Sequence, residues 1–212
     1  MSLVEHFRHE DTPSAEVERR EALYGPLGDS VRALVDATIR TELDEVAVRA
    51  ATAEVEAVVA RLRASQIDGA YGLRYNAEGR SWGWGNAVVG IRNGLAPPLA
   101  THRAESGAMY AELALGAAYE GAPGLLHTGV GAMLLDHIMG ETASGAVRVT
   151  FTGTLTMRCL RGTPLGPIRL DARVDRIEGP KVYVLATLSD PDGVAMESDG
   201  VFIVPRWARP ED

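Results

Sequence analysis

Apolar residues recur at helical spacing through the first third of the chain. Between Ser14 and Ser65 they repeat at i, i+3, i+4 and i+7, as in the set Val31, Leu34, Val35, Thr38 and the set Val55, Val58, Val59, Leu62. The pattern predicts two or three amphipathic helices. The GPLG sequence at 25–28 is expected to break the first run, with Asp29 or Ser30 capping the next helix and Thr41 to Asp44 marking a further start.

The pattern changes near residue 65 to short strands separated by glycine-rich turns. Residues 99–116 predict a hairpin that turns at Glu105, Ser106 and Gly107. After a helix, residues 146–160, 167–177, 181–190 and 194–204 alternate or are β-branched, which predicts four strands in an antiparallel meander. We therefore expect an α+β fold in which a sheet wraps one long helix, with a helical extension at 1–66 and the main domain at 67–212.

The helix expected from about Gly129 to Thr142 is apolar around its axis but contains Asp136. An all-round apolar helix fills a core, and a buried aspartate needs a partner to offset the loss of hydration. One interpretation is a structural hydrogen bond to nearby backbone or to His137. The other is that the helix borders a cleft in which a carboxylate has a chemical task.

The start of this helix favours the second interpretation. Gly124, His127, Thr128 and Gly129 surround the first turn, where free N–H groups and the helix dipole can hold a negatively charged oxygen. Asp136 follows His127 by about two and a half turns, on the order of 10 Å or slightly more. One carbonyl group does not easily contact both, so the sequence predicts a homodimer, or a dimer of dimers, with sites at the interface.

Composition and charge narrow the possible classes of protein. With 46% hydrophobic residues the chain can build a core, and its net charge of −8 argues against general nucleic-acid binding. The single cysteine, Cys159, excludes an internal disulfide and a cysteine-rich zinc site, and it is expected to be a small packed strand residue. No metal site is assigned, including at His6 and His9 near the acidic start. No membrane span or signal peptide is evident, so a cytoplasmic location without membrane contact is expected.

One stretch of the chain is locally basic. Residues 158–181 contain Arg158, Arg161, Arg169, Arg173, Arg176 and Lys181 against Asp171, Asp175 and Glu178, a local charge of +3. A small polyanionic ligand is one explanation, and a solvated outer face of strands is the other. The glycine-rich GWGNAVVG sequence matches no phosphate-binding loop, and no serine-hydrolase or zinc-peptidase motif is present. Trp82 and Trp84 are expected to pack, with an acyl-pocket role as the alternative.

The residues from about 93 to 205 resemble a known family. The sequence YEGAPGLLHTGVGAMLLDHIMG at 119–140, followed by RGTPLG, RIEGPKVYV and DPDG, is similar to the hotdog-fold acyl-CoA thioesterases of the phenylacetate-degradation (PaaI-like) branch. The resemblance implies a hotdog fold and hydrolysis of an acyl-CoA to a carboxylic acid and free coenzyme A, with coenzyme A as part of the substrate and no separate cofactor. A non-catalytic module that binds acyl-CoA or a hydrophobic ligand is the alternative.

The resemblance also implies roles for individual residues. Asp136 corresponds to the catalytic carboxylate, as nucleophile or general base, and the Thr128 and Gly129 amides to donors for the thioester oxygen. His127 would fix the loop, and Thr152 would be the polar helper, with Thr154 as the competitor. The coenzyme A phosphates are expected to meet Arg158, Arg161 and Arg176.

The chain departs from the family pattern at two positions. Thr128 replaces the first glycine of the His-Gly-Gly motif, which is costly if the backbone there has a positive φ. Gly121 stands where some relatives have an asparagine, so one side-chain donor is missing.

Overall fold

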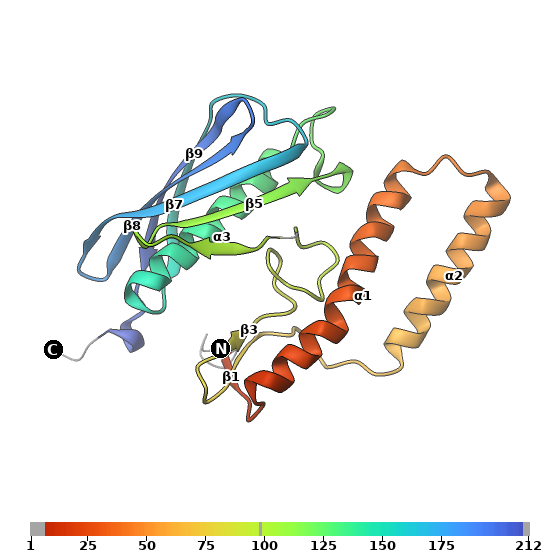
Figure 1. Ribbon diagram of the computed structural model, residues 1–212, viewed down its shortest axis with the longest axis horizontal. Coiled ribbons are helices and arrows are strands. Elements are labelled where there is room, and N and C mark those ends of the chain that lie inside the picture. Colours follow the sequence, from red (N-terminus) through yellow and green to blue (C-terminus); the bar gives the residue numbers. More distant parts are fainter. Residues whose placement is uncertain (1–6, 98, 210–212) are drawn as a thin grey trace. The chain divides into compact units, whose positions relative to one another are not determined.

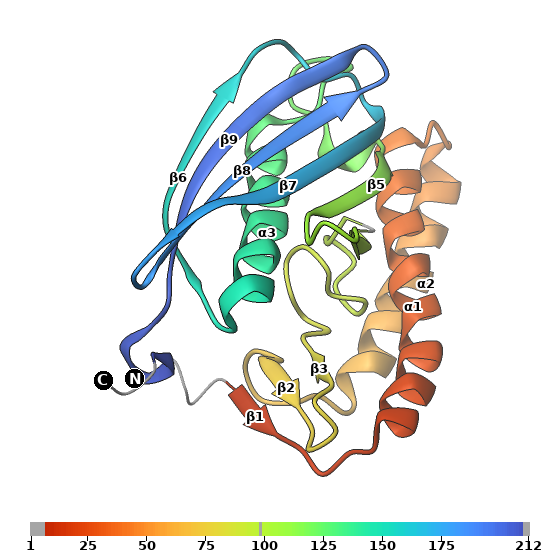
Figure 2. The same ribbon diagram turned by 60° about the vertical axis from the view of Figure 1, so that its left-hand side comes forward.

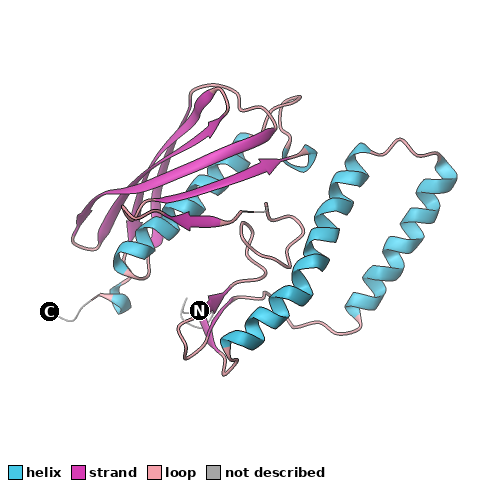
Figure 3. Cartoon of the chain, viewed as in Figure 1, coloured by secondary structure: helices cyan, strands magenta, loops and turns pink. Residues whose placement is uncertain are grey.

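The computed structural model describes residues 7–97 and 99–209, which form two compact units divided between Ala96 and Pro97 (Figure 1). The first unit contains two long helices, α1 (Ser14–Arg40) and α2 (Glu45–Arg63). It also contains a small sheet in the order β1 (Phe7–His9), β2 (Leu73–Tyr75), β3 (Ser81–Trp82). Figure 3 shows the two helices running antiparallel to one another.

Helix α1 continues through the predicted break. Pro26 lies inside the helix, and Gly28 is buried so tightly that a Cβ atom there would collide with the carbonyl oxygen of Ile91. Packing on the rest of the unit thus keeps the chain helical across GPLG, and the predicted break was wrong. Ser30 does not cap a helix, because its hydroxyl donates to the Pro26 carbonyl. The start near Thr41 to Asp44 is confirmed, since Asp44 caps α2 by accepting from the Ala47 amide at 2.9 Å.

The segment from 67 to 96 belongs to the helical unit. Trp82 and Trp84 are buried with Val17 of α1, so their packing role is confirmed. Arg80 adds ion pairs to Glu18 and Glu21 of α1 at 2.7 and 2.6 Å. The units therefore divide later than the predicted boundary at 66, because these long-range contacts are not visible in local composition.

The second unit is one curved antiparallel sheet around one helix (Figure 2). Its strands are β4 (Thr101–Arg103), β5 (Met109–Leu115), β6 (Phe151–Cys159), β7 (Gly166–Glu178), β8 (Lys181–Asp190) and β9 (Gly193–Ile203). The helix is α3 (Thr128–Val147). Short 3₁₀ turns lie at Ala117–Tyr119 and Arg206–Ala208. The predicted α+β layout and the hairpin between β4 and β5 are confirmed.

The sheet order is β4-β5-β7-β8-β9-β6, so only β7, β8 and β9 form a simple meander. Strand β6 pairs with β9 at the far edge, which corrects the expectation that all four strands follow one another. The connection from β6 to β7 lies on the loop before α3. The Leu126 amide donates to Thr163 and the Leu165 amide to Gly124, at 2.8 and 3.0 Å. These two hydrogen bonds fix the connection from β6 to β7 against the loop before α3, so the two strands are not joined by a tight turn.

Helix α3 is buried along one face and half-buried along the other. The buried residues, Gly131, Leu134, Leu135, Ile138, Met139, Thr142 and Ala143, keep the i, i+3, i+4, i+7 spacing and face the sheet. Met133, Asp136 and Gly140 lie on the half-buried face. The expectation of burial on all sides was therefore wrong, because a curved sheet covers only part of the helix. None of the helices in the described parts of the chain combines the length and apolar composition needed to cross a bilayer.

Candidate functional site

Asp136 and Thr152 form a hydrogen-bonded pair. The Thr152 hydroxyl donates to Asp136 Oδ1 at 2.8 Å. Thr152 is the second residue of β6, and Asp136 lies near the middle of α3. Asp136 is half-buried, and Thr152 is exposed. His137, the residue after Asp136, contacts Glu141 and not Asp136, with 3.2 Å between His137 Nε2 and Glu141 Oε1. The alternative of an Asp136–His137 hydrogen bond therefore does not hold. One carboxylate oxygen is thus fixed by Thr152 on a face of α3 that the sheet leaves partly open.

A β-bulge selects Thr152 over Thr154. Thr152 lies opposite Phe202, which is 1% exposed on the helix side of the sheet, whereas Thr154 lies opposite Val201. The register shifts between the two threonines at Gly153, so they point to opposite faces although they are two residues apart. The sequence left Thr152 and Thr154 as alternatives for the polar residue beside Asp136. The glycine inside a strand was the available signal for the bulge.

His127 caps α3. Its Nδ1 accepts a hydrogen bond from the Gly129 amide at 3.0 Å, so the neutral imidazole carries its hydrogen on Nε2. Its own amide donates to the Tyr119 carbonyl at 2.9 Å, which ties the cap to the preceding loop. The expected loop-fixing contact of His127 is present. The Gly129 amide is occupied by this cap, so of the two expected donors only Thr128 keeps an N–H outside any hydrogen bond to a described residue.

Thr128 adopts an ordinary helical backbone. It is the first residue of α3, and in the described ranges Arg148 is the one non-glycine residue with a positive φ. The expected cost of a β-branched side chain at a positive φ therefore does not arise. Its amide is one of the orphan donors of a helix start.

Asp136 and the start of α3 are separated within one chain. Asp136 follows Thr128 by eight residues of continuous helix, about 12 Å along the axis. The structure therefore does not bring the Thr128 amide and the Asp136 carboxylate around one carbonyl group in a single copy.

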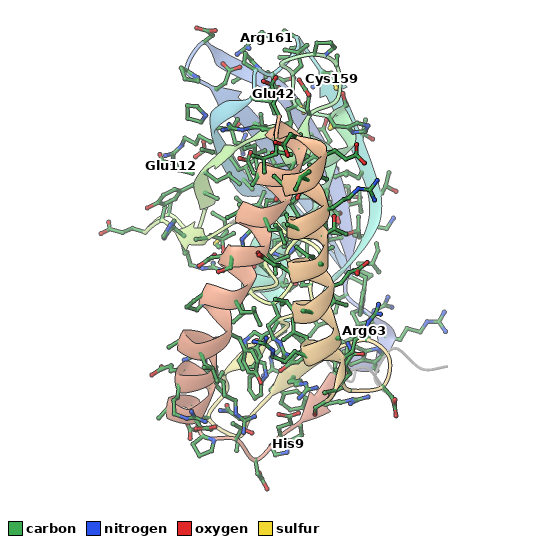
Figure 4. The ribbon with its side chains drawn as sticks, turned by 90° about the vertical axis from the view of Figure 1, so that its right-hand side faces the viewer. His9, Glu42, Arg63, Glu112, Cys159 and Arg161 are labelled. Atoms are coloured by element: carbon green, nitrogen blue, oxygen red, sulfur yellow. The ribbon has the colours of Figure 1, made fainter. Side chains whose placement is uncertain are left out.

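A cavity of about 550 Å³ adjoins the start of α3. It lies between the loop before α3 and the connection from β6 to β7. Its lining residues are Glu120, Gly121, Ala122, Leu125, Leu126, His127, Thr128, Cys159, Arg161, Gly162, Thr163 and Met196. Figure 4 labels Cys159 and Arg161 at this end of β6. Cys159 is exposed, which corrects the expectation of a packed cysteine.

The three arginines expected to bind phosphate do not converge. Arg158 pairs with Glu197 at 3.1 Å on the outer face of the sheet. Arg161 lines the cavity at α3 and pairs with Asp190. Arg176 pairs with Asp175 and Glu178 at 2.8 and 2.7 Å, near the far end of β7 and about 33 Å from its start. Neighbouring carboxylates therefore neutralise the local positive charge.

Arg161 and Asp190 fix the crossover to the β8–β9 turn. Two guanidinium nitrogens of Arg161 contact Asp190, with Nη1 2.6 Å from Oδ2, and Nη2 also donates to the Gly193 carbonyl at 2.7 Å. The Asp190 side chain is 2% exposed. The hydrogen bonds from Arg161 hold the pKa of Asp190 below its ordinary value of 3.8. The sequence reasoning missed this pair, because it joins residues far apart in the chain.

We expect Asp190→Asn to lower the free energy of unfolding at pH 7 by about 2 kcal/mol, since Arg161 loses its anion. Because the pKa of Asp190 is lowered by folding, its stabilisation is present above the unfolded pKa and is lost as pH falls through the folded pKa. Denaturant-induced unfolding should be measured between pH 7 and pH 2. The free energies of unfolding of the wild type and the variant should become equal toward pH 2. Asp175→Asn, which removes an exposed pair, should change stability by less than about 1 kcal/mol. An equal loss in both variants would contradict this assignment.

In the described ranges, no group of three or more His, Cys, Asp and Glu side chains is placed to hold a metal ion. His6 lies outside those ranges.

The helix wrapped by the curved sheet and the strand order are those of a hotdog fold. The chain is similar to a solved structure described as a thioesterase superfamily protein, with 28% sequence identity and a TM-score of 0.75. The match covers 85% of this chain and 94% of the solved chain. Over 87 residues, the chain is 37% identical to acyl-coenzyme A thioesterase THEM5 of Mus musculus and 31% identical to THEM4 of Bos taurus. These matches cover 40% of this chain and 35% of each curated relative. No protein-family model matches the chain.

Proposed function

We propose that the protein hydrolyses acyl-CoA thioesters. The observation that carries this proposal is the Asp136 carboxylate, held by the Thr152 hydroxyl on the open face of the wrapped helix. The names of the relatives THEM5 and THEM4, both acyl-coenzyme A thioesterases, support the same reaction. The motif at 119–140 further supports a place in the phenylacetate-degradation branch. A cytoplasmic location stays a prediction.

The proposed reaction adds water across the carbon–sulfur bond. The oxygen of water bonds to the thioester carbonyl carbon, the bond from that carbon to sulfur breaks, and the proton lost by water reaches the leaving thiolate. Asp136 serves as general base for the water, or as nucleophile in a first step that forms an acyl anhydride which water then cleaves. The Thr128 amide stabilises the negative charge that develops on the carbonyl oxygen.

A complete site in this proposal uses two copies of the chain. The 12 Å or so between Asp136 and the Thr128 amide along one helix is too long for both to contact one carbonyl. A second copy that places its α3 start near the half-buried face of the first α3 would satisfy both contacts. The expected contacts of Arg158, Arg161 and Arg176 with coenzyme A remain predictions, and each would require a change in its present ion pair.

A thiol-release assay over acyl-CoAs of increasing chain length tests the function. Release of free coenzyme A by the purified protein, above the spontaneous rate, is the expected result. The alternative is a non-catalytic acyl-CoA binding module, and the occupied Gly129 amide favours it, since a single remaining donor gives a weaker oxyanion site. Tight binding of acyl-CoA without release of coenzyme A would establish that alternative and reject hydrolysis.

We expect Thr152→Val to lower kcat by about 10- to 100-fold, because a hydrogen bond to a charged group is removed. Thr154→Val provides a matched control in the same strand, since Thr154 lies on the opposite face of the sheet. The control should keep wild-type kcat in the same assay. Equal kcat values in both variants would show that the contact with Asp136 has no role in turnover.

A further inference from the structure

Helix α2 is exposed along nearly its whole length. Of its 19 residues, Ala47 is half-buried and the others are exposed. Helices α1 and α2 run antiparallel, but along their lengths they do not approach to the separation of about 8–10 Å between axes at which helices pack. Helices in folded proteins owe most of their stability to the packing of an apolar face. A further packing partner for α2 is therefore expected.

Both helices have an apolar stripe that is open to solvent. The stripes consist of nine large side chains, each at least 36% exposed: Leu23, Leu27, Val31 and Leu34 of α1, and Val48, Val55, Val58, Val59 and Leu62 of α2. Leu27, Val31 and Leu62 line one cavity of about 710 Å³, so the two stripes border the same groove between the helices. Nine such side chains present several hundred Å² of apolar surface, which approaches the roughly 800 Å² that each partner contributes to a stable interface.

The charges along α2 are complementary to those of a second α2 that runs in the opposite direction. Figure 4 labels Glu42 and Arg63 at the two ends of this helix. Arg61 and Arg63 lie in its last turn, and neither forms an ion pair with a described residue. In an antiparallel pair centred between Thr52 and Ala53, the pairs of opposite charge are Glu42 with Arg63, Asp44 with Arg61, and Arg49 with Glu56. The other charged residues between 42 and 63 lie opposite alanines, so no like charges meet.

We propose that the helical unit is a docking surface for a second copy of this chain, with the α2 helix of each copy lying antiparallel in the groove between α1 and α2 of the other. A surface that is complementary to itself in this way is what a twofold-symmetric contact requires. The apolar stripes form the core of the interface, and the charged residues form its rim. The proposed function needs two copies at α3 and makes no demand on the helical unit, so the inference does not rest on it.

Cross-linking at the middle of α2 tests the arrangement on the full chain. Thr52→Cys, in a Cys159→Ser background, places one thiol beside its symmetry mate at the twofold axis. A short bismaleimide at micromolar protein concentration should then give a covalent dimer on a denaturing gel. Ala53→Cys in the same background is the matched control, because the next residue of a helix is turned by about 100° and here points away from the stripe. It should run as a monomer. Failure of Thr52→Cys to cross-link, or equal cross-linking of both variants, would overturn the proposal.

Replacing Val55 by aspartate tests the apolar part of the interface. Val55 lies in the middle of the α2 stripe, so each pair of copies would bury two new charges. Sedimentation equilibrium should show self-association of the chain weakened by about 100-fold or more. Val46→Asp is the control, since Val46 is 79% exposed and precedes Val55 by nine residues, or about two and a half turns, which places it on the opposite side of α2. It should associate as the wild type does. Equal association of the two variants would contradict the proposed interface.

Other occupants of the groove would give different results. If another part of the same chain covered it, Val55→Asp would lower the free energy of unfolding and leave self-association unchanged, and Thr52→Cys would not cross-link. A lipid or an unrelated protein as occupant would also leave the purified Thr52→Cys chain without a covalent dimer. Each of these results would reject the second copy as the partner. Release of coenzyme A is measured separately, so cross-linked protein without hydrolysis would support the interface and reject the proposed function.

Discussion

Replacing Asp136 by asparagine is expected to lower kcat for acyl-CoA hydrolysis by about 10³-fold or more, because asparagine is neither a base nor a nucleophile. The substitution keeps the shape of the side chain and an oxygen that can accept from Thr152. The effect should therefore fall on kcat, with acyl-CoA still bound. Single-turnover release of coenzyme A measures the chemical step directly.

A control for this variant is available on the same unit. Asp199→Asn changes an exposed carboxylate on the outer face of the sheet, 3.9 Å from Arg158, and should keep wild-type turnover. Thermal unfolding should show that both variants remain folded, since Asp136 is half-buried and Asp199 exposed. Wild-type hydrolysis by Asp136→Asn would refute the role of this carboxylate.

The sequence predicts the wrapped helix and its aspartate well because both depend on local signals. The apolar series within α3 identifies the helix, and the loop with Gly121, Pro123 and Gly124 before it places the helix start within a residue or so of where it lies. An aspartate in such a helix draws attention because an unpaired buried charge is costly. The hydrogen bond from Thr152 adds the partner, which requires knowledge of strand register.

The errors of sequence reasoning arise from contacts between distant segments. The place of β6 beside β9 depends on the crossover loop bonding to the loop before α3, and alternation within a strand contains no such information. Helix α1 continues through Pro26 because Gly28 packs against Ile91. The basic stretch loses its apparent charge for the same reason, since Arg161 meets Asp190 only in the folded chain.

Replacing Thr128 by proline is expected to lower kcat by about 10²- to 10³-fold, the usual effect of losing one oxyanion donor. Proline removes the amide hydrogen and is well tolerated at the first position of a helix. The preceding residue, His127, has φ −62° and ψ 123°, a conformation that proline permits in its neighbour. Thr128→Ala removes the side chain but keeps the amide, and it should retain near wild-type kcat. Equal losses in both variants would assign the effect to the side chain and contradict a backbone role.

Hybrid dimers of Thr128→Pro and Asp136→Asn protomers test whether each site draws on two copies. If one protomer supplies the amide and the other the carboxylate, a hybrid contains one site with both groups intact and one site with neither. A randomly exchanged one-to-one mixture then regains about a quarter of wild-type activity, because about half of the dimers are hybrids with one active site of two. If both groups came from one protomer, every site would lack one group and no activity would return. The 12 Å or so between these groups along α3 leads us to expect recovery.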